Sequence, residues 1–453
     1  MRWGGSIGGI CRAVDSCGSF FLGGGAPLKT HEVFGIRPDI NAYSYVDRGS
    51  LDAEVQKLLD RKHKHIAIRG ASKSGKSWLR QKILNNPIVV QCRLDYSVID
   101  IYRDALSRLD VRFEVEKVTS RSFEARISAS GEAGLKLLAK LQGGVEVGAN
   151  AGVQETTQPV GKDHADLEFV ASIIKESGRT LVIEDFHYLP TEEQKRFAFD
   201  LKTLWDYRLF VVVVGVWSTQ NMMITLNPDL SERIEEVSVV WTSTELKKIL
   251  EQGCRHLGLT PSSSVAEEFA SISYESAGLL QSLALRYIDD ELGIRDGTAS
   301  EDPRTLDDVD KVRDAAMHVA EQLNQLYQTF ARRVSEGIRS RTNATGIYAH
   351  AMAVIMEAED SALTDGMSAK DIHAAAHARQ PRIQLSNLKA VLSKFPSLQV
   401  DEAGRGLVLA YDDQEELVSV VDKQLLLYRR FATVRWPWED LIAEVSGKDQ
   451  AFD

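Results

Sequence analysis

Short apolar runs alternate with amphipathic segments through the first half of the chain. Runs of about four to eight apolar residues are typical of strands that a parallel sheet buries on both faces. Such runs lie at 66–69, 88–92, 180–186, 209–217 and 236–241, and helical spacing is found at 50–61, 78–84, 97–109, 163–177 and 191–205. Because predicted strands and helices alternate, we expect an α/β core with a parallel sheet over 41–242.

Three stretches depart from this alternation. Residues 119–141 have a mixed pattern that favours helix, and the glycine-rich segment 143–153 predicts a loop or a short hairpin. The segment 1–40 begins with several pairs and triplets of glycine. Its apolar stretches are shorter than the roughly 7–15 residues of a signal-peptide core, so we expect a loose extension.

Helical patterns dominate after residue 243, where we expect an all-helical subdomain over 243–340. Its predicted helices lie at 244–256, 264–274, 277–292 and 305–336. Over 341–453 the predicted elements are helices at 348–359, 368–377 and 383–394, strands at 398–400 and 407–409, and a helix at 415–431. Three helices followed by a two-stranded ribbon is the order of a winged-helix domain.

The composition narrows the classes of function. A chain of 453 residues with 43% apolar and 26% charged residues is ordinary for a globular protein of two or three domains. No run approaches the roughly 18 apolar residues of a membrane span, so we expect a cytoplasmic protein without a membrane partner. The net charge of −11 means that any DNA contact needs a local basic patch. The cysteines form no C-x-x-C pair, which favours reduced thiols; they are Cys11, Cys17, Cys92 and Cys254.

The strongest chemical motif directly follows the first predicted strand. Residues 70–77 read G-x-x-x-x-G-K-S, and a helical pattern begins after them. In this context glycines let backbone amides turn towards an anion, and the helix N-terminus adds positive charge. Lys76 is expected to reach the β- and γ-phosphates, and Ser77 to ligate Mg²⁺. The predicted ATP site comprises Gly70, Ala71, Ser72, Lys73, Ser74, Gly75, Lys76, Ser77 and Trp78.

A second candidate element is the predicted strand at 180–186, which ends in Glu184 and Asp185. Parallel strands deliver their carboxyl ends to one edge of the sheet, so we expect both acids beside the phosphate loop. Glu184 is the candidate for the Mg²⁺ shell, and Asp185 for polarising the attacking water. The order Glu-Asp reverses the usual Asp-Glu, and it leaves open how the two acids divide these roles.

Two further segments are candidates for contact with the nucleotide. The aromatic-rich segment 43–51 either wraps the base or docks the chain on the core, and Arg48 is the candidate ligand within it. The polar segment 218–221 follows a buried strand, and it either faces the γ-phosphate or forms a turn.

The order of these motifs resembles the AAA+ and STAND classes of P-loop ATPases. With a winged-helix tail, the chain is most similar to the origin-recognition and initiator type and its transposon and signalling relatives. The resemblance implies a homo-oligomer with nucleotide at the subunit interface and an arginine that reaches the γ-phosphate from the neighbour. Arg233 matches that position, and the alternative is a surface salt bridge. The family's lid arginine is missing after Gly278, which favours the STAND branch and slow hydrolysis.

Basic residues also gather around the expected winged helix. They favour contact with DNA phosphates, although acids outnumber bases over 346–453 and winged helices also bind proteins. The residues are Arg332, Arg333, Arg339, Arg341, Arg379, Arg382, Lys389, Lys394 and Arg405.

Our leading hypothesis is therefore an ATPase that acts as a nucleotide-dependent switch. It would control oligomer assembly or a separate effector protein, by analogy with stand-alone ATPases of mobile-element or antiviral systems. The alternative is an initiator or loader that docks its winged helix on duplex DNA. A third class is a scaffold that binds nucleotide without turning it over.

Overall fold

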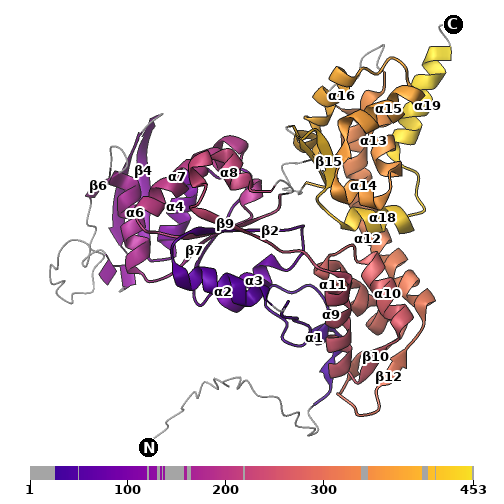
Figure 1. The fold of residues 1–453 in the computed structure, drawn as a ribbon, viewed down its shortest axis with the longest axis horizontal. Helices are drawn as coiled ribbons and strands as arrows, with labels where there is room; N and C mark the ends of the chain where they lie inside the picture. Colours follow the sequence, from indigo (N-terminus) through magenta and orange to yellow (C-terminus); the bar gives the residue numbers. More distant parts are fainter. Residues whose placement is uncertain are drawn as a thin grey trace, which may run out of the picture.

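The chain folds into three regions that follow one another along the sequence (Figure 1). The computed structural model describes residues 26–48, 50–119, 122–129, 133–134, 136–137, 158–160, 165–217, 220–337, 345–399, 407–413 and 415–450. An α/β core occupies one side of the molecule, and a helical lid and a C-terminal domain lie together on the other. Within these ranges, no helix combines the length and apolar character needed to cross a membrane.

The core is built on a five-stranded sheet in the order β3-β7-β8-β2-β9, with every pair of neighbours parallel. The strands are β2 (His65–Arg69), β3 (Ile88–Gln91), β7 (Leu181–Glu184), β8 (Val211–Gly215) and β9 (Ile234–Ser238). The predicted parallel α/β core is confirmed. The last strand begins and ends earlier than its apolar pattern suggests, because Val239 and Trp241 are buried beyond the end of β9.

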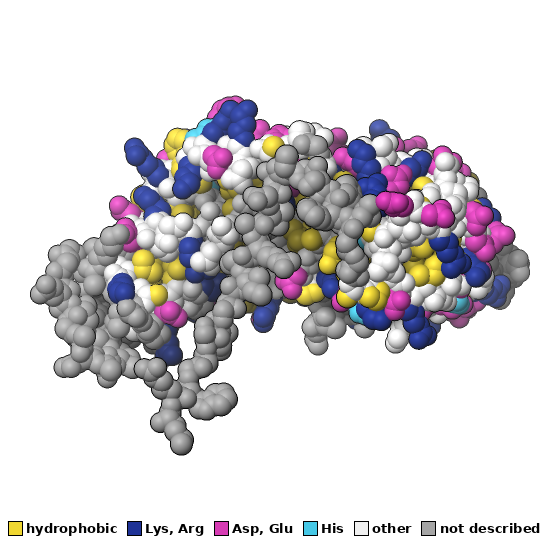
Figure 2. All heavy atoms as spheres, turned by 90° about the horizontal axis from the view of Figure 1, so that it is seen from below, with side chains coloured by type: hydrophobic (Ala, Val, Ile, Leu, Met, Phe, Trp, Pro, Cys, Tyr) yellow, Lys and Arg dark blue, Asp and Glu magenta, His cyan; other side chains and the backbone are white. Residues whose placement is uncertain are grey.

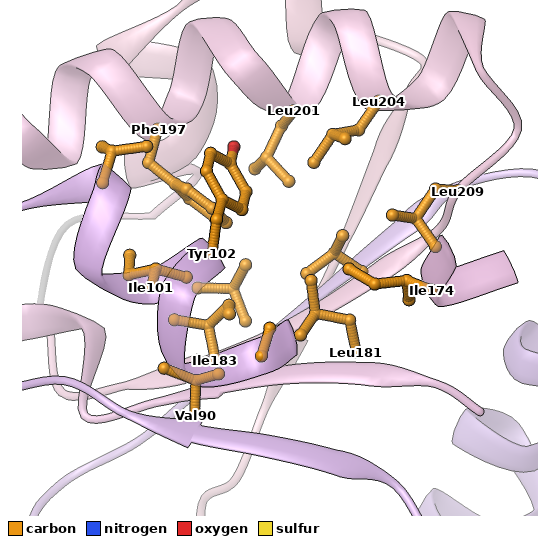
Figure 3. Packing of buried hydrophobic residues seen from close by; sticks show 14 of the residues in the cluster. Val90, Ile101, Tyr102, Ile174, Leu181, Ile183, Phe197, Leu201, Leu204 and Leu209 are labelled. Carbon is orange, nitrogen blue, oxygen red and sulfur yellow. The ribbon is translucent and has the colours of Figure 1, made fainter. Parts of the chain in front are cut away.

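Helices cover both faces of this sheet, which explains the almost continuous apolar strands. Val90 and Ile183 point to one face, where Figure 3 shows them with Ile101, Phe197 and Leu201 in a single packed cluster. The helices on this face are α4 (Val98–Ser107), α6 (Ala165–Glu176) and α7 (Thr191–Asp206). The opposite face is covered by α2 (Leu51–Arg61) and α3 (Lys76–Ile83).

The strand order brings three strand ends together. β8 lies between β2, which leads into the phosphate loop, and β7, which ends at Glu184. Because the strands run parallel, Gly70, Glu184 and Gly215 lie at the same carboxyl edge. The remaining short elements of the core are η1 (Phe186–Tyr188), α8 (Met222–Leu226) and η2 (Pro228–Leu230).

An antiparallel sheet is inserted between α4 and α6. It consists of β4 (Val111–Thr119), β5 (Ser122–Ala129) and β6 (Gln158–Val160), in that order. The helix predicted over 119–141 is therefore wrong for 122–129. Phe123, Ala125 and Ile127 recur with the period of two that marks a strand, and this period outweighs the mixed helical spacing. The segment 143–153 lies outside the described residues.

The lid contains more than the predicted helices, because it also takes in residues near the N-terminus. β1 (Leu28–Lys29) pairs with β11 (Asp296–Gly297), and α1 (Thr30–Val33) follows. Phe34 is fully buried in the lid core, and a Cβ at Gly253 would lie only 2.3 Å from the end of its ring. The extension predicted over 1–40 thus becomes part of the lid from Leu28 onward.

The other lid elements follow the helical pattern closely, with one small addition. A short parallel pair, β10 (Leu259–Pro261) and β12 (Arg304–Leu306), corrects the expectation that this region is helix alone. The first lid helix is capped by Thr242 and begins at Ser243, one residue before the predicted start at 244. The lid helices are α9 (Ser243–His256), α10 (Ser263–Ile272), α11 (Ala277–Leu285), the π-helix η3 (Arg286–Glu291) and α12 (Val309–Glu336).

Helix α12 joins the lid to the C-terminal domain. Its 28 residues span about 42 Å at the usual helical rise. Val312 and Ala316 belong to the lid core, whereas Tyr327 and Phe330 belong to the core of the C-terminal domain. A single continuous helix therefore contributes to both hydrophobic cores.

The C-terminal domain runs in the order helix, helix, strand, three helices, strand, strand, and two further helices follow. Its three strands form one antiparallel sheet in the order β13-β15-β14. The strand predicted at 398–400 is wrong, because the chain is helical up to Gln399, and the strand predicted at 407–409 overlaps the observed strand only at Leu409. The helix predicted at 415–431 is wrong for 417–420, which form a strand. The elements are α13 (Ile347–Glu357), α14 (Asp360–Asp365), β13 (Met367–Ser368), α15 (Ala369–Arg379), α16 (Leu385–Leu392), α17 (Phe395–Gln399), β14 (Leu409–Asp412), β15 (Leu417–Val420), α18 (Gln424–Phe431) and α19 (Pro437–Gln450).

Candidate nucleotide-binding site

The phosphate loop joins β2 to α3, and its two glycines are required by its geometry. A Cβ at Gly70 would lie 2.7 Å from the carbonyl oxygen of Val239 and 2.8 Å from Ser74 Oγ. Gly75 has a φ of +88°, in the left-handed region that glycine adopts without strain. Since α3 begins at Lys76, the amides of its first turn have no intrahelical partner. This is a cradle of the kind that an anion fills.

Lys76 is folded back into the loop. Its Nζ donates to the carbonyl oxygens of Gly70 at 3.1 Å and Ala71 at 2.7 Å. Burial lowers the pKa of Lys76 to about 8, while Asp185 and Glu184 act in the opposite direction. Its partners inside the loop are neutral oxygens, these two carbonyls and Ser74 Oγ at 3.5 Å, so charged phosphate oxygens would be better acceptors for the ammonium group. The residues therefore fit a polyphosphate ligand.

The two acids occupy different surroundings at the end of β7. Glu184 Oε1 accepts from Arg80 Nε at 3.1 Å, and both side chains are at most 14% exposed. Asp185 has a φ of 56°, and its Oδ2 accepts from Gln91 Nε2 at 2.9 Å. Asp185 raises the pKa of Lys76 more than Glu184 does. The structure thus brings both acids to the loop, with Glu184 tied to α3 and Asp185 electrostatically coupled to Lys76.

The segment around Arg48 packs beside the same loop. Its guanidinium carbon lies 4.4 Å from the centroid of the Trp241 ring, and Trp241 Nε1 donates to the carbonyl oxygen of Ser74 at 2.7 Å. Among the residues that the structure describes, none forms a hydrogen bond with the buried Nη1 of Arg48, and burial lowers the pKa of this residue. An unpaired buried donor beside the cradle fits a nucleotide contact. Trp78 lies further along α3, where its Nε1 donates to the carbonyl oxygen of Arg37 at 3.1 Å.

The loop also contacts both other regions of the molecule, through Lys73. The amide of Gly278, at the start of α11, donates to the carbonyl oxygen of Lys73 at 3.0 Å. A Cβ at Gly278 would lie 2.7 Å from Lys73 Cβ, so the lid helix closes directly onto the loop. Lys73 Nζ donates to Oε1 of Gln424 in the C-terminal domain. Next to Gln424, Lys423 forms an ion pair of 2.5 Å with Glu275 of the lid.

Arg233 lies at the opposite edge of the sheet from this site. It immediately precedes β9, and its guanidinium carbon lies 5.0 Å from the centroid of the Trp205 ring. Its Nη1 donates to the carbonyl oxygen of Asp229. Arg233 thus cannot reach the phosphate loop of its own chain, and its action on a neighbouring subunit stays a prediction.

The polar segment after β8 is only partly described. Residues 218 and 219 lie outside the described residues, and the amide of Asn221 donates to Glu236 Oε1 at 3.1 Å. His187 Nδ1 accepts from the amide of Val216 at 3.3 Å, and burial lowers the pKa of His187 to about 4. His187 is thus a neutral packing residue that orients the end of β8.

Sequence reasoning missed three residues of the site. Arg80 lies one helical turn after Ser77, so its position on the loop-facing side of α3 could have been read from the spacing. Trp241 and Gln424 contact the loop from 167 and 351 residues away along the chain. No local pattern signals such distant contacts.

Two of the basic residues predicted to contact DNA form ion pairs within the chain. Lys389, on α16, forms a 2.6 Å ion pair with Glu416, and Arg379 pairs with Glu357. Basic and acidic side chains are mixed over the face shown in Figure 2. Arg339, Arg341 and Arg405 lie outside the described residues.

The comparisons with known proteins give matches of structure only. No protein-family model and no curated protein matches the sequence. The ORC1 protein of Aeropyrum pernix, solved in complex with DNA, is 12% identical over 92% of this chain and 97% of its own, with a TM-score of 0.37. A Signal Transduction ATPase with Numerous Domains (STAND) protein with a tetratricopeptide repeat sensor, from Pyrococcus horikoshii, is 14% identical over 88% of this chain and 44% of its own, with a TM-score of 0.35. The RuvB Holliday junction branch migration motor of Thermotoga maritima is 12% identical over 83% and 93%, with a TM-score of 0.34.

Both branches named by the sequence resemblance occur among these structures, one as an ORC1 protein and one as a STAND protein. At these TM-scores the likenesses carry no argument about activity or partners. The fold of this chain is identified by its own strand order and phosphate loop.

The lowered pKa of Lys76 predicts how nucleotide affinity depends on pH. Phosphate oxygens favour the charged ammonium and raise its pKa, so binding above about pH 8 takes up a proton. We expect full affinity below pH 8 and a loss approaching tenfold per pH unit above it. Isothermal titration calorimetry between pH 7 and pH 10 checks this, with two buffers of different ionisation enthalpy to count the proton. An affinity that is constant to pH 10 would contradict the prediction.

Proposed function

We propose that this protein is a Mg-ATP-binding ATPase that acts as a nucleotide-dependent switch. A single observation carries this proposal: Lys73 of the phosphate loop contacts both Gly278 of the lid and Gln424 of the C-terminal domain. A ligand that reshapes the loop must alter contacts with both regions at once. The binding energy of the nucleotide is thereby coupled to domain arrangement.

The loop residues divide the work of holding the nucleotide. Residues 70–77 would cradle the phosphates, Lys76 would neutralise their charge, and Ser77 and Glu184 would hold Mg²⁺. When bound, Mg²⁺ offsets the charge that develops on the phosphoryl group. Asp185 orients the attacking water, and Arg48 contacts the base or ribose. Hydrolysis is slow, because Leu279, Leu280 and Gln281 directly follow Gly278, where the resemblance implies an arginine.

The switch controls the assembly of the chain with copies of itself or with a separate effector protein. Arg233 fits this role, because it lies on the edge of the sheet that is remote from its own loop. Action on a neighbour's γ-phosphate would place the nucleotide between subunits.

Cys92 and Cys254 are buried free thiols, which supports a reducing, cytoplasmic location. The role in a mobile-element or antiviral system is by analogy alone.

Removing the Gln424 side chain tests the switch. We expect Gln424→Ala to weaken the hold of the C-terminal domain on the loop, since Lys73 Nζ loses its partner. The variant should then bind ATP more tightly than the native chain, by about threefold to tenfold, because less binding energy is spent on separating the domains. Titration calorimetry measures the affinity, and analytical ultracentrifugation with and without ATP measures the assembly state.

Lys370→Ala is the matched control, since Lys370 is exposed on α15 of the same domain and away from the loop. Equal ATP affinity in the native chain and in both variants would contradict the proposed switch, although it would leave the proposal of nucleotide binding unaffected. If ATP does not change the mass of the particle, the proposed role in assembly is wrong.

Duplex DNA is the alternative partner, and the element order of the C-terminal domain supports it. The helices α15, α16 and α17 precede the strand pair β14 and β15, and β13 completes the sheet β13-β15-β14, an order that resembles a winged helix. The ion pair between Lys389 and Glu416 leaves α16 with little free positive charge, which favours protein contact over DNA. Retention on duplex DNA that weakens as salt rises would instead favour DNA over protein as the partner of this domain.

A further inference from the structure

A cavity of about 250 Å³ opens at the amino edge of the core sheet, on the side opposite the phosphate loop. The first residues of β2 and β8 and the residues before β7 form one wall. The last turn of α2 and the end of α6 form the other. None of the residues assigned to nucleotide binding lines this cavity.

The inner surface of the cavity is apolar. Ile66 and Val212, which face each other in the register of β2 and β8, form its floor. Leu58, Leu59 and Leu209 enclose it from the helix and loop side. Such a floor favours an apolar group of matching size, because covering it removes hydrocarbon from water.

The rim of the cavity is basic and contains no acidic residue. Its cations come from four different segments of the chain, so no single helix end accounts for them. They are Lys62, Lys64, Lys175, Arg179 and Arg208.

Four of these five cations have no carboxylate partner in the described part of the chain. Lys64 alone is neutralised, by Glu235 at 3.1 Å and Glu232 at 3.7 Å. Arg179 donates to three backbone carbonyl oxygens, and Lys175 Nζ donates to that of Tyr207 at 2.9 Å.

The last two cations of the rim, Lys62 and Arg208, are exposed and hold left-handed backbone angles, with φ of 47° and 57°. The chain reverses at each of them, immediately after α2 and after α7. Both residues line the cavity, so their charges are added to those of Lys175 and Arg179 at its mouth.

We propose that this cavity binds a small amphipathic anion, with its carboxylate, sulfonate or phosphate group at the rim and an apolar body on the floor. The two parts of this ligand follow from the two surfaces of the cavity. The cations of the rim attract an anionic group, and the apolar floor disfavours an anion that is hydrated on all sides. An inorganic phosphate ion satisfies only the rim, and a neutral hydrocarbon only the floor. The site is therefore selective for molecules that carry both features.

The position of the cavity makes it a second ligand site within the core. β2 starts at the cavity and ends at the phosphate loop, and its five residues span about 16 Å. β7 likewise runs from the cavity to Glu184. A ligand here lies on the same strands as the nucleotide site without touching it. Binding at the cavity can thus be tested with no nucleotide present, independently of the proposed switch.

The test uses anilinonaphthalene sulfonate, a fluorescent aromatic anion, on the full-length chain. We expect saturable fluorescence enhancement that decanoate reverses and decanol, its neutral counterpart, does not. The double variant Lys62→Glu/Arg208→Glu should weaken probe binding at least about tenfold, because it replaces two attractive charges with repulsive ones. Lys57→Glu/Lys195→Glu is the matched control, with exposed lysines on α2 and α7 away from the cavity, and should change the affinity less than about twofold.

Equal weakening in both double variants would show a general charge effect and overturn the site. Equal displacement by decanol would also overturn it, since the cations would then play no part. The milder pair Lys62→Gln/Arg208→Gln guards against misfolding, and its melting temperature should match that of the native chain. If that folded variant binds the probe as tightly as the native chain does, the proposal is wrong.

Discussion

Replacing Lys76 by alanine is expected to remove most of the protection that Mg-ATP gives to the folded chain. A ligand at 1,000 times its dissociation constant stabilises the folded state by about 4 kcal/mol. Lys76 supplies a buried ammonium group to the cradle, and its present partners are the carbonyl oxygens of Gly70 and Ala71 and the hydroxyl oxygen of Ser74. Without that charge the affinity should fall at least about 100-fold, since bonds to charged groups contribute about 1.5–3 kcal/mol each. Thermal unfolding with and without Mg-ATP measures the loss.

The same variant should leave the protein without nucleotide at least as stable as the native chain. Burial lowers the pKa of Lys76, which means that the charged side chain is held at a cost in the folded state. Loss of binding can therefore be separated from misfolding. Lys57→Ala, an exposed lysine on α2, should keep full protection by Mg-ATP. Equal protection of native chain and Lys76→Ala by Mg-ATP would exclude the cradle as the nucleotide site.

The local parts of the fold could be predicted because their signals are contained in a few residues. The phosphate loop combines two glycines, a lysine and a serine at fixed spacing, and the structure shows why neither glycine tolerates a side chain. The buried strands were visible as apolar runs because helices cover both faces of the sheet. The carboxyl edge then follows from parallel pairing, which brings Glu184 beside the loop.

The parts that escaped prediction depend on contacts between distant segments. Phe34 enters the lid because Gly253 leaves room for its ring, and neither residue signals this alone. The C-terminal ribbon was placed too early, since Leu398 and Gln399 carry strand-like apolar spacing but end a short helix. Gln424 is an ordinary helix residue until the fold puts it against Lys73. Tertiary packing decides such positions, and a single sequence does not record it.

Glu184 and Asp185 remain the open question of the site, because their order is the reverse of the usual one. Their surroundings now differ: Glu184 is paired with Arg80, whereas Asp185 is the stronger electrostatic partner of Lys76. An acid that orients water must act on the transition state, and an acid that holds Mg²⁺ must act on binding. These two roles give different kinetic signatures in matched amide variants.

Asp185→Asn should therefore abolish turnover while preserving binding. We expect phosphate release to fall at least about 100-fold, because the amide cannot accept a proton from water, and ATP affinity to stay within about threefold. Glu184→Gln should instead raise the Mg²⁺ concentration needed for half-maximal ATP binding, and Asp60→Asn, an exposed acid on α2, should change neither quantity. If Glu184→Gln abolishes turnover and Asp185→Asn raises the Mg²⁺ requirement, the roles assigned to the two acids must be exchanged. Near-zero release in the native chain, Asp185→Asn and Lys76→Ala alike would show a scaffold that binds nucleotide without hydrolysing it.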